Sequence, residues 1–120
     1  MSASLIEIFA SIQGEGIYVG VPTVFVRFGG CDLRCAWCDS PETWSRSPRC
    51  RVEESPGSER FGEIDNPLGT GAVLDIVAGL DPERRMAVSL TGGEPLLQAA
   101  SVGEIARHLG EDQREVHLET

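Results

Sequence analysis

The sequence predicts an α/β fold built on a parallel sheet. From residue 23 onward, segments typical of strands alternate with segments typical of helices, in the order strand, helix, strand, helix, strand. A helix between two strands returns the chain to the same edge of the sheet, so the strands run parallel. Only Thr120 follows the last strand, so no further helix covers this strand and its outer side would be exposed. We therefore expect the 120 residues to be a truncated gene product or one piece of a larger assembly.

The first half of the chain contains two segments with strand character. Residues 5–13 are expected to be extended, and the glycine-rich residues 14–16 to form a loop after them. Residues 23–28, Thr-Val-Phe-Val-Arg-Phe, are β-branched and aromatic and end at two glycines, which predicts a strand. Residues 45–70 collect prolines and glycines among scattered charges, so we interpret them as an irregular insertion in a single domain that spans residues 1–120.

The second half alternates helices and strands. Apolar residues recur at helical spacing over residues 71–80, and Asp81-Pro82 is a stop signal. Residues 86–90 read as a buried strand, and a helix is expected from Pro95 to about residue 109. Alternation over residues 115–119 predicts the last strand.

Composition and charge narrow the classes of function. The chain is 41% hydrophobic, yet it has neither an apolar run of the roughly 18 residues that span a membrane nor a secretory signal, so we expect a cytoplasmic protein. Ten Lys and Arg against 19 Asp and Glu give a net charge of −9. This charge disfavours nucleic acids and anionic membranes as partners.

Three of the four cysteines are clustered directly after the strand at residues 23–28. Three residues separate Cys31 from Cys35, and two separate Cys35 from Cys38. Clustered thiols in a reducing compartment usually indicate metal or redox chemistry. Three thiolates on one loop would hold three irons of a [4Fe–4S] cube and leave the fourth open to a reacting ligand.

Three other interpretations of these cysteines remain. A four-thiolate zinc site would use Cys50, although zinc sites usually present two tight pairs of ligands. A redox pair of Cys35 and Cys38 would leave Cys31 without a role. The thiols could also be unrelated buried side chains.

The cysteine spacing resembles that of the radical S-adenosylmethionine (SAM) enzymes, whose fold is a partial (βα)6 barrel. The resemblance implies that this chain encodes the N-terminal half of such a barrel and that SAM chelates the open iron. Thr91-Gly92-Gly93-Glu94 follows the strand at residues 86–90, where these enzymes bind SAM. Gly93 and Glu94 are therefore expected to contact SAM, although such a turn also occurs without a ligand.

The first forty residues resemble one family of these enzymes more closely, the 7-carboxy-7-deazaguanine synthases. The matching segments are Ile12-Gln13-Gly14-Glu15-Gly16, Gly20-Val21-Pro22, residues 25–28 and residues 31–40. The resemblance implies a lyase that converts 6-carboxy-5,6,7,8-tetrahydropterin to 7-carboxy-7-deazaguanine with loss of ammonia, in queuosine biosynthesis. It also implies an electron donor such as flavodoxin or ferredoxin, and a homodimer when the protein is full length.

The family's binding residues carry over by matching position. Arg27 would meet the substrate carboxylate, and alternation along its strand places it with Thr23 and Phe25 on one face. Arg27 could instead point to solvent or pair with an internal acid such as Glu15. Ser40 stands where many relatives have a threonine that helps bind Mg²⁺, but Ser40-Pro41 could equally start a turn. The other expected contacts are Ile12, Gln13, Gly14 and Thr91 for the substrate, and Trp37, Cys38 and Asp39 for SAM.

Two other functions compete with this one. Activases that install a glycyl radical on a partner protein share the cysteine spacing. A truncated, non-catalytic metal-binding module would keep the three cysteines, with zinc or no metal bound, and would catalyse no reaction.

Overall fold

We describe the chain from a computed structural model, in which residues 2–14, 16–29, 49–92 and 95–119 are described. Within these ranges, no helix is both long and apolar enough to cross a membrane. The strands are β1 (Ser2–Ala3), β2 (Leu5–Ile12), β3 (Pro22–Phe28), β4 (Arg49–Glu53), β5 (Phe61–Asp65), β6 (Leu68–Gly69), β7 (Ala87–Gly92) and β8 (Val116–Leu118). The helices are the 3-10 helices η1 (Gly16–Tyr18) and η3 (Pro95–Gln98) and the α-helices α1 (Thr70–Leu80) and α2 (Ala99–Glu111).

Six strands form the main sheet, in the order β5-β4-β2-β3-β7-β8. The strands β3, β7 and β8 are parallel neighbours, with α1 before β7 and α2 before β8, as predicted. The strands β4, β5 and β6, which were not predicted, stand between β3 and α1 in the sequence. The strand β2 runs antiparallel to β3 and parallel to β4, so the sheet is mixed. The short strands β1 and β6 pair separately.

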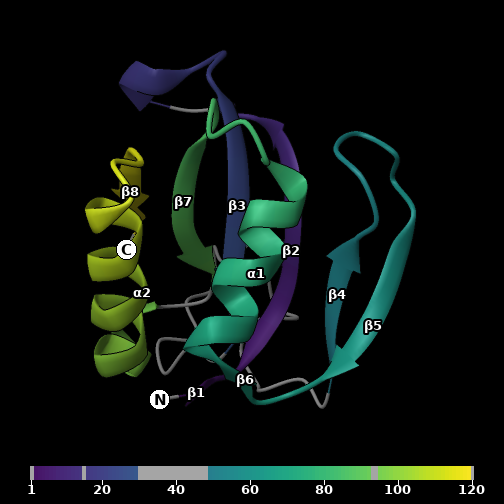
Figure 1. Cartoon of the computed structure of the whole chain (residues 1–120), viewed down its shortest axis with the longest axis vertical. Coiled ribbons are helices and arrows are strands. Elements are labelled where there is room, and N and C mark those ends of the chain that lie inside the picture. The colour runs from purple at the N-terminus through teal and green to yellow at the C-terminus, as the bar shows by residue number, and fades with distance from the viewer. Residues whose placement is uncertain (1, 15, 30–48, 93–94, 120) are drawn as a thin grey trace, which may run out of the picture.

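Both α-helices cover the same face of the main sheet. In Figure 1, α1 crosses in front of β2 and β3, and α2 lies beside β7 and β8. Apolar residues of the two helices and of the strands beneath them form one core, and we call the other side of the sheet the open face. The main core residues are Val24, Val26, Phe28, Val73, Val77, Leu80, Val88, Leu90, Val102, Ile105 and Leu109.

The prediction of irregular structure over residues 45–70 is wrong for the strands at residues 49–53, 61–65 and 68–69, and residues 45–48 lie outside the described residues. Residues 49–65 form the antiparallel hairpin β4–β5, and β4 pairs with β2 through Glu7–Arg51 and Ile8–Val52. Cys50 packs in the core, and the carboxylate of Glu53 accepts a hydrogen bond from the Ala10 amide at 3.0 Å. Pairing with a distant strand therefore orders a segment whose prolines and glycines indicated a loop.

The helix expected from Pro95 is divided in two. Residues 95–98 form η3, and α2 begins only after Gln98, whose backbone is not helical (φ −123°, ψ 43°). The Gln98 side chain accepts a hydrogen bond from the Ser4 amide at 2.8 Å and donates to the Ser4 carbonyl at 2.9 Å. It also donates to the Gly29 carbonyl at 3.2 Å. Gln98 thus ties the start of α2 to Ser4, directly before β2, and to Gly29, directly after β3.

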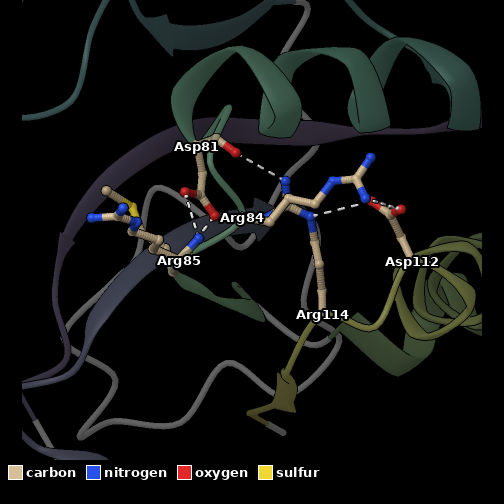
Figure 2. A network of polar contacts seen from close by, with 6 residues as sticks. Asp81, Arg84, Arg85, Asp112 and Arg114 are labelled. Carbon is tan, nitrogen blue, oxygen red and sulfur yellow. Dashed lines mark hydrogen bonds and ion pairs between the residues drawn. The ribbon is translucent and has the colours of Figure 1, made fainter.

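A buried ion pair joins the turns at the other end of the sheet (Figure 2). Asp81 follows α1, and its Oδ2 lies 2.6 Å from Nη1 of Arg114, with both side chains at most 4% exposed. The same carboxylate accepts hydrogen bonds from the amides of Arg85 and Met86 at 3.0 and 2.9 Å. Burial by itself raises the pKa of Asp81, but these amide bonds and Arg114 together lower the pKa below its ordinary value.

Candidate functional site

The carboxyl ends of the parallel strands meet at one edge of the sheet. Phe28 at the end of β3 pairs with Gly92 at the end of β7, and β8 ends beside Leu90. The backbones of β3 and β7 lie very close together here, since a Cβ atom added at Gly92 would be only 2.3 Å from the Phe28 carbonyl oxygen. Ligand sites of parallel strand–helix folds gather at such an edge.

All of the predicted cofactor residues lie outside the described residues. Gly29, just before them, is described, and its amide donates to the Ser4 carbonyl at 2.9 Å. The predicted residues outside the described ranges are Cys31, Cys35, Trp37, Cys38, Asp39, Ser40, Gly93 and Glu94.

A cavity of about 440 Å³ lies on the open face of the sheet. Its walls come from β2, from the residues that follow β2, and from the ends of β3, β7 and β8. All five residues predicted to contact the substrate line it, and their role as substrate contacts stays a prediction. These residues are Ile12, Gln13, Gly14, Arg27 and Thr91.

Backbone hydrogen bonds hold Gln13 in the cavity wall. Its amide donates to the Val21 carbonyl at 3.0 Å, and its carbonyl accepts from the Gly20 amide at 2.8 Å. Gly20 has a φ of +88°, a left-handed conformation that glycine adopts without strain. The loop between β2 and β3 therefore fixes the backbone around Gln13, whose side chain is buried.

Arg27 is partly buried in the cavity wall and has an acidic partner. Its Nε lies 3.1 Å from Oε2 of Glu7, the residue opposite it on β2. Arg27 therefore pairs with an internal acidic residue, as one alternative predicted. The partner is Glu7, and the contact uses only Nε of the guanidinium. Within the described ranges, the terminal nitrogens Nη1 and Nη2 of Arg27 make no hydrogen bond.

Aromatic and acidic residues beyond the predicted substrate contacts also line the cavity. The rings of Phe9 and Phe25 stack on the open face with centroids 5.2 Å apart, which gives the cavity an apolar floor. Glu119 follows β8, and its carboxylate accepts a hydrogen bond from the Ser89 hydroxyl. Alternation along residues 5–13 could have indicated Phe9, but only the strand pairing reveals its neighbour.

Cys50 does not fit the metal site of the alternative zinc interpretation. Its side chain is fully buried in the core beneath β4. Burial raises the pKa of the Cys50 thiol to about 12, and the nearby Glu7 carboxylate contributes to the increase. Because metals bind the thiolate, this residue is a poor fourth ligand.

The sequence matches the family model of the 4Fe-4S single cluster domain over residues 12–118. The chain belongs to this family. It is 43% identical over 99 residues to a 7-carboxy-7-deazaguanine synthase from Geobacter sulfurreducens, covering 80% of this chain and 39% of the relative. It is 41% identical over 117 residues to the synthase from Methanopyrus kandleri, covering 95% of this chain and 46% of the relative. The chain thus spans less than half the length of both relatives.

A solved structure has the same fold. The crystal structure of QueE from Escherichia coli matches with a TM-score of 0.69 and 28% sequence identity, over 100% of this chain and 53% of that chain. The match confirms the expected fold class, the N-terminal half of a radical SAM barrel.

Proposed function

We propose that this chain belongs to a radical SAM lyase that converts 6-carboxy-5,6,7,8-tetrahydropterin to 7-carboxy-7-deazaguanine. The cavity on the open face carries the proposal, because it gathers Gln13, Arg27 and Thr91 from separate segments of the chain. An amide, a guanidinium and a hydroxyl suit a flat heterocycle with a hydrogen-bonding edge and a carboxylate. The relatives named as synthases of this product support the same substrate.

Each wall residue has a physical role in substrate binding. Arg27 binds the substrate carboxylate, since a guanidinium and a carboxylate form paired, charge-assisted hydrogen bonds. Gln13 and the backbone beside it meet the polar edge of the pterin, and Thr91 donates or accepts one further hydrogen bond. The stacked rings of Phe9 and Phe25 form an apolar surface that excludes water beside the substrate.

We assign the [4Fe–4S] cluster to Cys31, Cys35 and Cys38. The family match favours a single [4Fe–4S] cluster, and the burial and raised pKa of Cys50 favour the three clustered cysteines as its ligands. Trp37, Cys38, Asp39, Gly93 and Glu94 would hold SAM. When bound, the cluster and SAM supply the radical that removes a hydrogen atom from the substrate.

The remaining features of the proposal concern Mg²⁺, the partners and the location of the protein. The Ser40 hydroxyl would help bind Mg²⁺, together with substrate oxygens and water, because Mg²⁺ prefers oxygen ligands. A small reduced protein such as flavodoxin or ferredoxin would supply the electron. We propose a homodimer in the cytoplasm for the complete protein.

The test begins with anaerobic reconstitution of the chain with iron and sulfide. We expect about four irons per chain and a brown chromophore in the wild type, and loss of both in Cys35→Ala. Cys50→Ala is the matched control and should keep its iron, because Cys50 lies in the core. A colourless wild type that binds zinc instead would identify a non-catalytic metal module.

The reaction itself is tested with SAM, dithionite and the carboxy-tetrahydropterin. Formation of 7-carboxy-7-deazaguanine, detected by mass spectrometry, would support the proposal, and Arg27→Met should lower the yield at limiting substrate. A reconstituted chain that cleaves SAM without forming the deazaguanine would count against this substrate and favour the glycyl-radical activase.

A further inference from the structure

A row of charged side chains crosses the open face of the sheet at the level of Arg27. The strand register pairs Arg51 of β4 with Glu7 of β2, and Glu7 with Arg27 of β3. Glu7 Oε2 lies 3.1 Å from Nε of Arg27, and Oε1 lies 3.5 Å from Nη1 of Arg51. Each carboxylate oxygen of Glu7 therefore faces a different guanidinium.

Arg51 braces the outer end of this row. Its guanidinium carbon lies 4.3 Å from the centroid of the Phe61 ring on β5, a distance that allows a cation–π interaction. The Arg51 side chain is 54% exposed, whereas those of Glu7 and Arg27 are 19% and 24% exposed. The row is thus anchored at the hairpin, and its two inner members, Glu7 and Arg27, are both less exposed than Arg51.

Glu7 does not line the substrate cavity. It lines an adjoining cavity of about 670 Å³ between β2 and the hairpin β4–β5, which shares Phe9, Ser11 and Ile12 with the substrate cavity. Arg27 lines only the cavity that we assign to the substrate. Glu7 contacts Nε of Arg27, and no group within residues 2–14, 16–29, 49–92 and 95–119 forms a hydrogen bond with the terminal nitrogens Nη1 and Nη2, which the proposal assigns to the ligand. Glu7 therefore acts on a ligand through Arg27.

We propose that Glu7, braced by Arg51, is a positioning residue that holds Arg27 so that its terminal nitrogens bind the substrate carboxylate. The inference rests on the proposed function, because it requires a carboxylate in this cavity. It adds the geometry of recognition, a carboxylate bound end-on at Nη1 and Nη2.

If Glu7 acts only through its charge, its removal should strengthen carboxylate binding, whereas a positioning role predicts that binding weakens. The two arginines and one glutamate sum to +1, and Glu7→Leu raises the sum to +2. Attraction by charge alone would then bind a carboxylate more tightly. Positioning predicts weaker binding, because an unanchored Arg27 must lose its rotamer freedom when the ligand binds.

The experiment compares two fluorescent probes, 6-carboxypterin and pterin, which differ only in the carboxylate. The ratio of their dissociation constants isolates the carboxylate contact from binding of the ring. We expect Glu7→Leu to reduce the preference for 6-carboxypterin about five- to tenfold, the cost of ordering one long side chain. Glu7→Gln should keep most of the preference, because its amide oxygen still accepts the Nε hydrogen of Arg27.

Glu63→Leu is the matched control. Glu63 is an acidic residue on β5 that pairs with Arg49 at 3.5 Å, and its exposure equals that of Arg51. Its removal changes the net charge by the same amount and should leave the preference unchanged. Thermal melts of all variants establish that they remain folded at the temperature of the titration.

The outcomes separate this inference from the proposed function. A wild type without a preference for 6-carboxypterin would overturn both, because the cavity would not hold a carboxylate at Arg27. If the wild type shows the preference and folded Glu7→Leu keeps or increases it, the positioning role is wrong and the proposed substrate stands. Equal losses in Glu7→Leu and Glu7→Gln would also overturn the positioning role.

Discussion

Gly92 is confined by the backbone of the neighbouring strand. Its φ of +146° is a conformation that other residues rarely adopt, and a Cβ atom would lie 2.3 Å from the Phe28 oxygen and 2.6 Å from the Phe28 nitrogen. We expect Gly92→Ala to lower the free energy of unfolding by about 1–3 kcal/mol, through strain and displacement of the end of β7. Urea unfolding followed by circular dichroism measures this change.

Gly103 provides the control for this prediction. It lies within α2, and a Cβ atom there would meet nothing within 4 Å. Gly103→Ala should therefore raise stability by about 0.5–1 kcal/mol, because alanine is the better helix former. Equal stability of the wild type and Gly92→Ala would show that the strand end relaxes freely.

The position of a single residue could be predicted where the alternation of its own strand determines which face it occupies. Alternation along residues 23–28 indicated correctly that Arg27 lies on the face opposite the buried Val24, Val26 and Phe28. It could not indicate Glu7 as the partner of Arg27, because the register of β2 against β3 follows from the folded loop between them. The sequence placed Gly92 in the turn that follows the strand at residues 86–90, and the structure shows that the close approach of the Phe28 backbone requires a glycine there.

At the scale of elements, periodicity predicted those whose signal is local. The helix α1 and the strands β3 and β7 lie where apolar spacing placed them. The hairpin β4–β5 was missed because its strands are short and polar, and because β4 depends on pairing with β2, more than forty residues earlier in the chain. Alternation of Cys50 and Val52 with charged residues was the available signal, and neighbouring prolines and glycines obscured it.

The pair of Asp81 and Arg114 is the main polar link between elements at the far end of the sheet. Among the described residues, Asp81→Asn would leave the buried guanidinium with only the longer carboxylate contact, from its Nε to Oδ2 of Asp112 at 3.8 Å. We expect a loss of about 3 kcal/mol in the free energy of unfolding. Glu83→Gln is the control, because Glu83 and Arg85 form an exposed pair and its loss should cost less than about 1 kcal/mol. Chemical denaturation at pH 7 measures both.

The same pair predicts how stability depends on pH. The folded pKa of Asp81 lies below its ordinary value of 3.8, so its stabilisation is complete above that pH and disappears as the pH falls through the folded pKa. The stability difference between the wild type and Asp81→Asn should therefore be constant from about pH 5 to 7 and should shrink below about pH 4. A difference that grows on acidification would contradict the assigned charge state.

At the scale of the whole molecule, one face of the sheet packs against the helices, and the other, the open face, carries the candidate site. Apolar side chains of β3 and β7 meet α1 and α2 on one side, while Arg27 and Thr91 project from the same strands on the other. Strand alternation therefore places the candidate site directly behind the core. Because the central strands are fixed by packing, the site residues inherit well-defined positions.

This arrangement predicts a gradient of amide hydrogen exchange across the sheet. The strands β3 and β7 are paired on both sides and buried, whereas β5 is an edge strand whose residues are mostly exposed. We expect amides of β3 and β7 to exchange slower than those of β5 by about two orders of magnitude or more, measured by mass spectrometry on native protein. Exchange in β5 as slow as in β3 would show that the hairpin opens only with the whole fold. With the expected gradient, Arg27 would stay on a stable strand while local opening of the hairpin removes Arg51 from Glu7, which makes the brace the first part of the charged row to be lost.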